Sequence, residues 1–272
     1  MMAETRAVPG AESDRPNVAR LYDFFLGGHH NFAADREMAR HLLAVEPNAR
    51  YVVAQNRAFL GRAVRLLLAS GVRQFLDLGS GIPAQDNVHE IAQRGDPGSR
   101  VVYVDNDPVA VAHSRQILAG NKRTTVIQED LRRPEAVMAH PEATRLLDFS
   151  EPVGVLMVTI LHFIPDADDP AGVVGRLTGR LVPGSHLVIS HATHEAAPDT
   201  AAEVAKLYAS TSAAAHARSR QEILRFFGGF DLVEPGLVHQ PRWRPEVASV
   251  PDHQERVWFY AGVGRKPAAE PA

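Results

Sequence analysis

Three aspartates follow short apolar segments, in places where a carboxylate can reach a bound ligand. They are Asp77 in RQFLDLGSGIP, Asp105 in RVVYVDND and Asp130 at the end of TTVIQED. A carboxylate attracts a cationic group and repels a phosphate. Asp77 therefore favours a nucleotide-like ligand that carries positive charge and lacks phosphates.

Gly79 and Gly81 follow Asp77 closely and let a ligand approach the backbone, because they carry no side chain. The nicotinamide fingerprint Gly-x-Gly-x-x-Gly requires a third glycine, and its helix faces a pyrophosphate. Here Pro83 follows and the third glycine is missing. The loop and Asp77 together favour S-adenosylmethionine, which has a positive sulfur, an amino acid end and no phosphate. A nicotinamide oxidoreductase remains as a disfavoured alternative.

Asp105 and Asp130 extend the same pattern along the chain. At the end of a strand Asp105 can accept hydrogen bonds from both hydroxyls of a ribose, a geometry that all adenosine ligands share. Asp130 can accept a hydrogen bond from an adenine amino group. The ordinary alternatives are that Asp77 and Asp105 cap helices and that Asp130 is one of the acids that commonly end strands.

The elements that position these aspartates alternate between strand and helix. Strands are expected at 74–78, 100–107, 124–130, 151–160, 185–192, 230–238 and 255–264, and helices at 48–70, 86–94, 108–118, 134–147, 169–180, 201–210 and 221–227. Such alternation predicts a parallel sheet with helices on both faces and right-handed crossovers. The last two strands predict a C-terminal hairpin. Residues 15–40 predict two short helices around the turn GGHHN.

Composition sets the outer bounds. The 272 residues carry 29 basic and 32 acidic side chains, a formal net charge of −3, and no strongly basic block, so nucleic acid is not an expected partner. There is no cysteine, which excludes disulfides and thiolate metal sites. The longest apolar run, 153–164, is shorter than the roughly 20 residues of a membrane helix. We expect a cytoplasmic protein without a membrane anchor.

These motifs resemble the class I S-adenosylmethionine-dependent methyltransferases. More narrowly, RPNVARLYDFFLGGHHNFAADRE, NRAFLGRAV and FLDLGSGIP look like a bacterial group of these enzymes known as a domain of unknown function. The resemblance runs from about Arg15 to Arg265. It implies a Rossmann-like, doubly wound, seven-stranded and mostly parallel α/β sheet with an antiparallel last strand and an N-terminal helical cap. Cofactor then lies over the first strands and substrate beyond the fourth.

The resemblance also implies a set of cofactor contacts and a division of the chain. The N-terminal signature is expected to fold over the cofactor as a lid, and Arg57 can pair with the methionyl carboxylate or else be a solvated helix arginine. The expected contacts are Asp77, Gly79, Gly81, Asp105, Asn106, Asp130, Leu131, Tyr22, Gly28, Asn31, Arg57 and Thr159. The expected parts are a disordered N-terminus (1–14), a helical cap or lid (15–70), the methyltransferase domain (71–265) and a loose tail (266–272).

His162 is the candidate catalytic residue, because TILHFIPD follows the predicted fourth strand, where substrate should lie. A packing or loop histidine is the alternative. The spacing of His29, His30 and the histidines of the fifth strand does not predict a metal site.

The function expected from these residues is methyl transfer from S-adenosylmethionine to a small-molecule acceptor. A non-catalytic S-adenosylmethionine-binding sensor or partner protein is the alternative. The amino-methylating signature Asn/Asp-Pro-Pro-Tyr/Phe is absent after the fourth strand, which disfavours adenine or glutamine as acceptor. The acceptor, the atom methylated, the use of a base and the oligomeric state are left open.

Overall fold

A computed structural model describes residues 14–83, 86–246 and 257–268 of the chain. The helices are α1 (Val18–Phe25), α2 (Ala33–Val45), α3 (Ala49–Ala69), α4 (Val88–Gly95), α5 (Pro108–Ile117), α6 (Pro134–Ala139), α7 (Pro141–Leu146), α8 (Pro170–Gly179), α9 (Pro198–Tyr208) and α10 (Arg220–Arg225). Short 3₁₀ turns are η1 (Leu161–Phe163), η2 (Asp166–Asp168) and η3 (Gln240–Arg242). Their positions agree with the alternation predicted from the sequence.

The described strands form one mixed sheet. They are β1 (Gln74–Leu78), β2 (Arg100–Asp105), β3 (Thr124–Gln128), β4 (Gly154–Val158), β5 (His186–Ala192), β6 (Asp231–Leu232), β7 (Val238–His239) and β8 (Phe259–Arg265). Their order is β3-β2-β1-β4-β5-β8-β6, with β7 also paired to β8. The first five strands are parallel, and β8 pairs antiparallel with β5, β6 and β7. The predicted doubly wound α/β fold is therefore confirmed.

The sixth predicted strand differs in detail. The segment 230–238 is split into β6 and β7 by a turn in which Gly236 has φ of +84°, a conformation that L residues rarely adopt. The predicted seven strands are eight for this reason. The seventh predicted strand begins at Glu255, which lies outside the described residues. The predicted N-terminus 1–14 and tail 266–272 also lie outside them, apart from Asp14 and residues 266–268.

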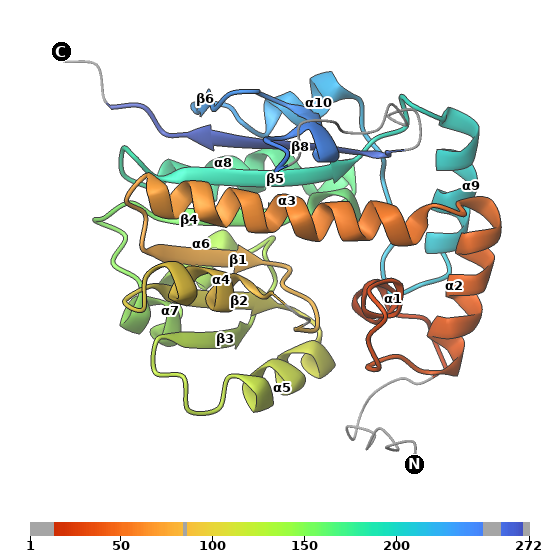
Figure 1. Cartoon of the computed structure of the whole chain (residues 1–272), viewed down its shortest axis with the longest axis horizontal. Helices are drawn as coiled ribbons and strands as arrows, with labels where there is room; N and C mark the ends of the chain where they lie inside the picture. Colours follow the sequence, from red (N-terminus) through yellow and green to blue (C-terminus); the bar gives the residue numbers. More distant parts are fainter. Residues whose placement is uncertain (1–13, 84–85, 247–256, 269–272) are drawn as a thin grey trace.

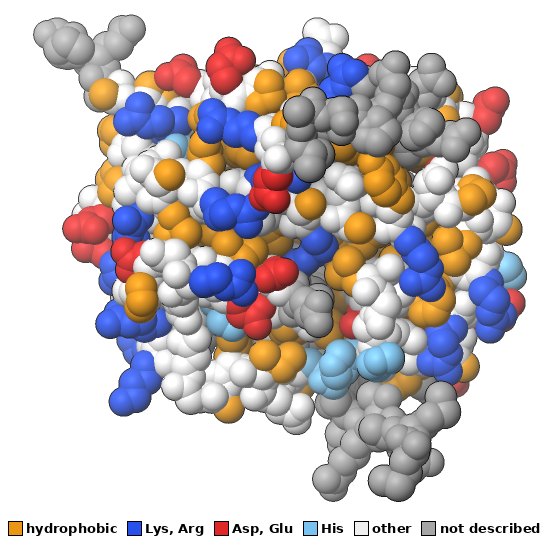
Figure 2. Space-filling model, in the orientation of Figure 1, with side chains coloured by type: hydrophobic (Ala, Val, Ile, Leu, Met, Phe, Trp, Pro, Cys, Tyr) orange, Lys and Arg blue, Asp and Glu red, His pale blue; other side chains and the backbone are white. Residues whose placement is uncertain are grey.

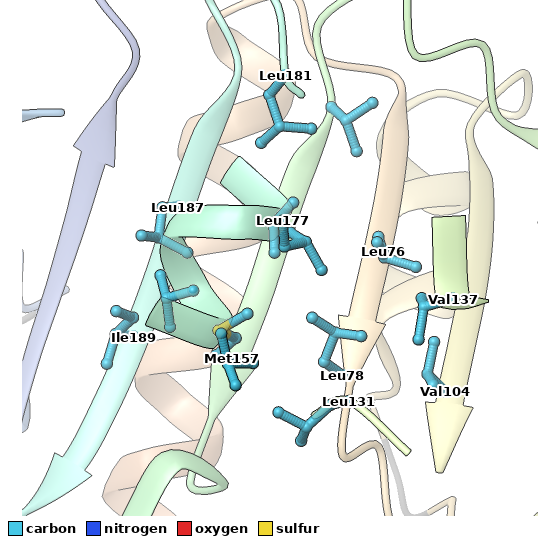
Figure 3. Packing of buried hydrophobic residues seen from close by; sticks show 14 of the residues in the cluster. Leu76, Leu78, Val104, Leu131, Val137, Met157, Leu177, Leu181, Leu187 and Ile189 are labelled. Carbon is cyan, nitrogen blue, oxygen red and sulfur yellow. The ribbon is translucent and has the colours of Figure 1, made fainter. Parts of the chain in front are cut away.

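Strand alternation divides the side chains of β1 between the two faces of the sheet. Leu76 and Leu78 pack with side chains from α6, α7, α8 and α10 on one face (Figure 3). Phe75 packs on the opposite face, in a cluster with side chains of α3, α4 and α5. Asp77 has the same parity as Phe75, so its side chain leaves the sheet on the face that α3 covers.

A third cluster forms the cap. Leu21 and Phe25 of α1 pack with Ala39 and Leu42 of α2, and α9 contributes Val204, Leu207 and Tyr208. Figure 1 shows these three helices beyond the arrowheads of β1, β2 and β3, so that the cap covers the carboxyl edge of the sheet. Ligands of doubly wound folds bind at this edge.

Helix α3 belongs to the sheet as much as to the cap. Its residues Phe59, Val64 and Leu67 are fully buried and share a cluster with Phe75 and Leu156. Figure 1 shows α3 running the length of the strands, with its first turns near the cap. The division of the chain at residue 70 stays a prediction, and α3 contacts the parts on both sides of it.

The described surface is mixed in charge. Figure 2 shows Lys and Arg side chains next to Asp and Glu over the face that it presents, in line with the net charge of −3. No described helix combines the length and the apolar composition needed to cross a bilayer.

Candidate active site

A cavity of about 820 Å³ opens at the carboxyl edge, between the strand ends and the cap. It is lined by side chains from α1, α2, α3 and α9 and by the loops that follow β1, β2, β3 and β4. The volume lies within the range of pockets for ligands the size of cofactors and drugs. Of the predicted contacts, all but Gly28 and Asn31 line this cavity.

Asp77 is a buried carboxyl group in the wall of the cavity, with 8% of its surface exposed. Burial raises its pKa to about 7; nearby Arg57 opposes this rise and Asp105 adds to it. A carboxylate in this place lacks the water that normally stabilises its charge. A cationic ligand group would therefore be attracted strongly to it.

The two glycines of the loop both adopt a left-handed backbone conformation, which favours glycine. Gly79 has φ of +72° and Gly81 has φ of +64°. A Cβ atom on Gly79 would lie 2.3 Å from Cγ1 of Ile160, so a larger residue does not fit. The loop thus keeps its backbone open to the cavity and tightly packed on the loop after β4.

Asp105 organises the loop and keeps capacity for a ligand. Its Oδ2 accepts the backbone N–H of Gly81 at 2.7 Å, and its Oδ1 accepts that of Asp107 at 2.9 Å. Burial raises its pKa to about 6, although these bonds oppose the rise. Each carboxylate oxygen can accept a second bond. Asp105 also lies beside Asn106 in the cavity wall, as predicted.

Asp130 and Leu131 line the cavity after β3. The carboxylate of Asp130 accepts hydrogen bonds from the side chain of Arg132, with Nη2 to Oδ2 at 2.6 Å, and Arg132 also bonds Asp168 at 2.8 Å. Burial raises the pKa of Asp130, but the bonds from Arg132 outweigh it and lower the pKa overall. Asp130 is thus charged and already hydrogen-bonded to Arg132, and its contact with the adenine amino group stays a prediction.

Gly28 and Asn31 lie outside the cavity lining and hold the turn after α1. The side chain of Asn31 donates to the Gly28 carbonyl at 2.9 Å and to Oδ2 of Asp23 at 3.0 Å. A Cβ atom on Gly28 would overlap the Asp23 carboxylate. Their contacts are therefore within the cap, and direct contact with cofactor remains a prediction.

The cap touches α5 at two points beside the cavity. Nδ2 of Asn17 donates to Oδ2 of Asp107 at 2.6 Å. The rings of His30 and His113 lie 4.5 Å apart. Because Asp107 caps α5 and directly follows the predicted ribose site, these contacts join the N-terminal signature to the cofactor side of the sheet.

A chain of hydrogen bonds runs from the cap to the strand ends. Nδ2 of Asn56 donates to the hydroxyl of Tyr22 at 2.8 Å. Oγ of Ser190 donates to Oδ1 of Asn56 at 2.6 Å, and the backbone N–H of Thr159 donates to Oγ of Ser190 at 3.0 Å. We call Tyr22, Asn56, Ser190 and Thr159 the relay. It links α1, α3, β5 and the residue after β4.

The relay determines where the Tyr22 proton points. Oγ of Ser190 receives the Thr159 N–H, so its own proton goes to Asn56, which leaves the amide N–H₂ of Asn56 for Tyr22. Tyr22 uses a lone pair in this bond and keeps its O–H for another partner. The side chain of Thr159 is one such partner, and because Tyr22 lines the cavity a bound ligand can be another.

Thr159 holds the end of the relay in an uncommon backbone conformation. Its φ is +61°, which a β-branched residue seldom adopts, and its N–H bonds both Oγ and the carbonyl of Ser190. Such conformations persist where surrounding contacts hold them. The predicted contact Thr159 therefore lies at the cavity wall in a strained conformation.

His162 lies in η1 at the far side of the cavity and is 3% exposed. Burial, with His191 and Arg218 nearby, holds the pKa of His162 well below its usual range, so the ring is neutral at pH 7. Arg218 donates to Nε2 of His191 at 2.9 Å and to the Leu161 carbonyl at 3.1 Å. Arg218 thereby fixes the loop that carries His162.

Sequence reasoning missed Asn56, Ser190 and Arg218. One signal was available, since Asn56 falls on the same helical face as Val52, Phe59 and Leu60, where a polar residue needs a partner. Ser190 and Arg218 give no comparable local signal. Their partners lie far away in the chain.

The sheet order, the loop with two left-handed glycines and the acids at successive strand ends together define a class I methyltransferase. A family model described as "S-adenosyl methyltransferase" matches residues 4–267, and the chain belongs to this family. S-adenosylmethionine is thus its cofactor, as the sequence predicted. Comparison with curated proteins found no match.

Solved structures agree with this assignment. A candidate methyltransferase from Thermobifida fusca YX is 39% identical, with TM-score 0.90, over 96% of this chain and 98% of that one. A DUF574 family protein from Streptomyces avermitilis MA-4680 is 38% identical, with TM-score 0.90, over 94% and 99%. The predicted resemblance to the group of unknown function is confirmed.

A more distant structure shares the fold. The N-methyltransferase NodS from Bradyrhizobium japonicum WM9 in complex with S-adenosyl-L-homocysteine is 16% identical, with TM-score 0.50, over 85% of this chain and 97% of that chain. None of the comparisons supports the alternative of a non-catalytic sensor.

Proposed function

We propose that this protein transfers the methyl group of S-adenosylmethionine to a small-molecule acceptor inside the cavity under the cap. The observation that carries the proposal is that one cavity contains two regions. The first region holds the buried carboxyl group of Asp77, with Arg57 nearby, and the second lies beyond Thr159 and reaches His162. A sensor needs the first region alone. Transfer needs both.

The residues of the cavity wall match the successive chemical groups of the cofactor. Asp77 faces its ammonium, while Arg57 and the O–H of Tyr22 face its carboxylate. The backbone of Gly79 and Gly81 lies along the nucleoside, and Asp105 accepts the ribose hydroxyls. When bound, the cofactor supplies a methyl group on a positively charged sulfur, which is its own leaving group.

The remaining task of the chain is to orient the acceptor and exclude water. The cap supplies the apolar side chains that exclude water, and its contacts with α5 close the cavity on the cofactor side. His162 is neutral and lies where an acceptor would be held, so it can accept a proton from the acceptor. We assign it this role.

Calorimetry with the full-length protein tests the cofactor part of the proposal. Both S-adenosylmethionine and S-adenosylhomocysteine are expected to bind and to raise the melting temperature, because they share every group that the wall contacts. NAD is expected to give no heat, since its pyrophosphate would approach Asp77. Binding of NAD without binding of either methionine derivative would refute the proposal.

The cap is expected to act as a lid. Its contacts with α5 include the Asn17–Asp107 hydrogen bond and the His30–His113 ring contact. Hydrogen exchange of backbone amides across 21–35 is expected to slow by about tenfold or more when S-adenosylmethionine is added, because closure reduces local opening. Mass spectrometry of peptic peptides measures this.

Strand β4 provides the internal control for the exchange measurement. Its residues are buried on both faces of the sheet, and their amide exchange is expected to be slow with and without cofactor. Equally slow exchange of 21–35 in both states would identify the segment as a static cap, and the lid would have to be abandoned.

A further inference from the structure

The part of the cavity beyond Thr159 differs in character from the cofactor wall. Aliphatic and aromatic side chains from the cap, from α3, from the loop after β4 and from the start of β8 dominate its lining. Those that bear on the argument are Phe25, Leu42, Val53, Phe163, Val204 and Phe259. A molecule held here exchanges water for apolar surface, which favours an apolar acceptor by about 25 cal/mol for each Å² buried.

Two polar groups in this region have no hydrogen-bond partner among the described residues. One is the ring of His162, whose Nδ1 is buried without a partner. The other is the hydroxyl of Tyr208, whose ring packs against Phe163 with centroids 5.7 Å apart. The Tyr208 side chain is partly buried and, like the His162 ring, lines the cavity, so a single ligand group can reach both.

The two groups differ in what they offer. Burial raises the pKa of Tyr208 to about 12, so its hydroxyl stays protonated and can donate. The neutral imidazole of His162 can accept a hydrogen bond through a ring nitrogen. A hydroxyl group is the simplest partner that both accepts from Tyr208 and donates to His162.

Charge argues against an ionic acceptor in this region. The ring of His162 is kept neutral, and the buried Arg218 near it is already bonded to the Asp166 carboxylate at 2.6 Å. Glu46 also lines the cavity, where one of its oxygens accepts the Asn48 N–H. It would repel an anion, and its position at the end of α2 places it in the cap rather than beside His162.

We propose that the methyl acceptor is an uncharged, mainly apolar molecule that presents a hydroxyl group to His162 and Tyr208. The proposal rests on the methyl transfer proposed above and names the class of substrate for that site. Tyr208 is then a residue that determines specificity, and His162 takes up the proton.

The transfer balances with these two residues. The acceptor oxygen forms a bond to the methyl carbon, and the carbon–sulfur bond breaks with its electron pair left on sulfur. The hydroxyl proton passes to a ring nitrogen of His162 and leaves to water when the product is released. Because burial makes His162 a weak base, the proton moves only once the oxygen has begun to bond carbon.

Three probes of equal ring size test the charge and the hydroxyl group. They are 2-naphthol, 2-naphthoate and 2-(aminomethyl)naphthalene, which are neutral, anionic and cationic at pH 7. Each is titrated by calorimetry into full-length protein saturated with S-adenosylhomocysteine. We expect 2-naphthol to bind at least about tenfold more tightly than either charged probe, since burial of an unpaired charge is costly.

Two tyrosine variants complete the test. Tyr208→Phe keeps the ring contact with Phe163 and removes one hydrogen bond, so its affinity for 2-naphthol is expected to fall about three- to tenfold. Tyr51→Phe is the matched control, because Tyr51 is 40% exposed and lies outside the cavity lining. It is expected to leave the affinity unchanged.

The outcomes separate this proposal from the proposed function. Tighter or equal binding of a charged probe, a change below twofold in Tyr208→Phe, or no binding of any probe to the loaded protein would each overturn the acceptor class. Failure of S-adenosylhomocysteine to bind would instead overturn the proposed function.

Discussion

Replacement of Asp77 by asparagine is expected to stabilise the ligand-free protein and to remove most of its affinity for S-adenosylmethionine. The side chain keeps its shape but loses a charge that burial makes costly. The carboxylate is also the group that we propose faces the cofactor ammonium. Stability and binding should therefore change in opposite directions at this one position.

The pH dependence of the free energy of unfolding gives the direction and the size of the effect of Asp77 on stability. Burial raises the pKa of Asp77 from its usual 3.8 to about 7, so between these values the folded protein holds a proton that the unfolded chain has released. The stability contributed by this group is thus complete below 3.8 and is lost as pH rises to about 7. The difference amounts to about 4 kcal/mol.

Urea unfolding at pH 5 and pH 8 measures the part of this difference that falls between pH 5 and about 7, about 3 kcal/mol. Wild-type protein is expected to lose stability between the two values, and Asp77→Asn to lose clearly less. Some dependence should remain, because the pKa of Asp105 is raised in the same direction, to about 6. Asp231→Asn, an exposed aspartate in β6, is the control and should behave as wild type.

Cofactor affinity provides the second measurement on the same variants. In wild type the cofactor affinity is expected to fall as pH drops below about 7, by at most tenfold for each pH unit. The reason is that the cofactor ammonium must displace a proton from Asp77. Asp77→Asn should show weak binding that does not change in this range. An asparagine variant that binds normally would contradict the assigned role.

Replacement of Asn56 by leucine is expected to cost about 2–4 kcal/mol of unfolding free energy. Asn56 is 2% exposed and bonds both Tyr22 and Ser190, so leucine removes the donor to the Tyr22 hydroxyl and the acceptor for the Ser190 hydroxyl. Loss of the relay should also loosen α1 and the strained Thr159. Cofactor affinity is then expected to fall with stability.

A milder variant separates these two effects. Tyr22→Phe removes the hydroxyl that points into the cavity and leaves the bond between Ser190 and Asn56. We expect a fall in cofactor affinity of about three- to tenfold with a smaller loss of stability. Gln116→Leu is the control for Asn56→Leu, because it also replaces an amide by leucine but at an exposed position on α5. An equal free energy of unfolding for Asn56→Leu and wild type would show that the relay does not stabilise the fold.

The sequence predicted the sheet and most of the residues that line the cavity at the strand ends, because both rest on local patterns. Alternating apolar runs, the glycines at 79 and 81 and the Asp107–Pro108 helix start all act between near neighbours in the chain, and the structure has them where expected. The split of 230–238 into two strands follows a local turn signal that the strand prediction overlooked, Pro235 and Gly236, and both short strands pair with β8.

The relay and the acceptor region could not be predicted in this way. Ser190 and Asn56 are separated by 134 positions in the chain, and Arg218 and Asp166 by 52. Their meeting depends on how helices lie across the sheet. Gly28 was predicted as a cofactor contact from a local pattern, and because its described contacts hold the turn after α1, that contact stays a prediction.

Helix α3 sets the boundary at which the protein can be recombined with its relatives. The same rigid helix buries Phe59 and Leu67 against the sheet and carries Asn56 and Arg57 into the cavity. A chimera joined at residue 70 would pair one protein's sheet with another's covering helix and disturb the packing of Phe75. A junction near residue 48 exchanges α1 and α2 alone. A graft of the cap that keeps α3 with its own sheet must therefore stop before α3 begins, and it leaves His162 and Tyr208 of the acceptor region in place.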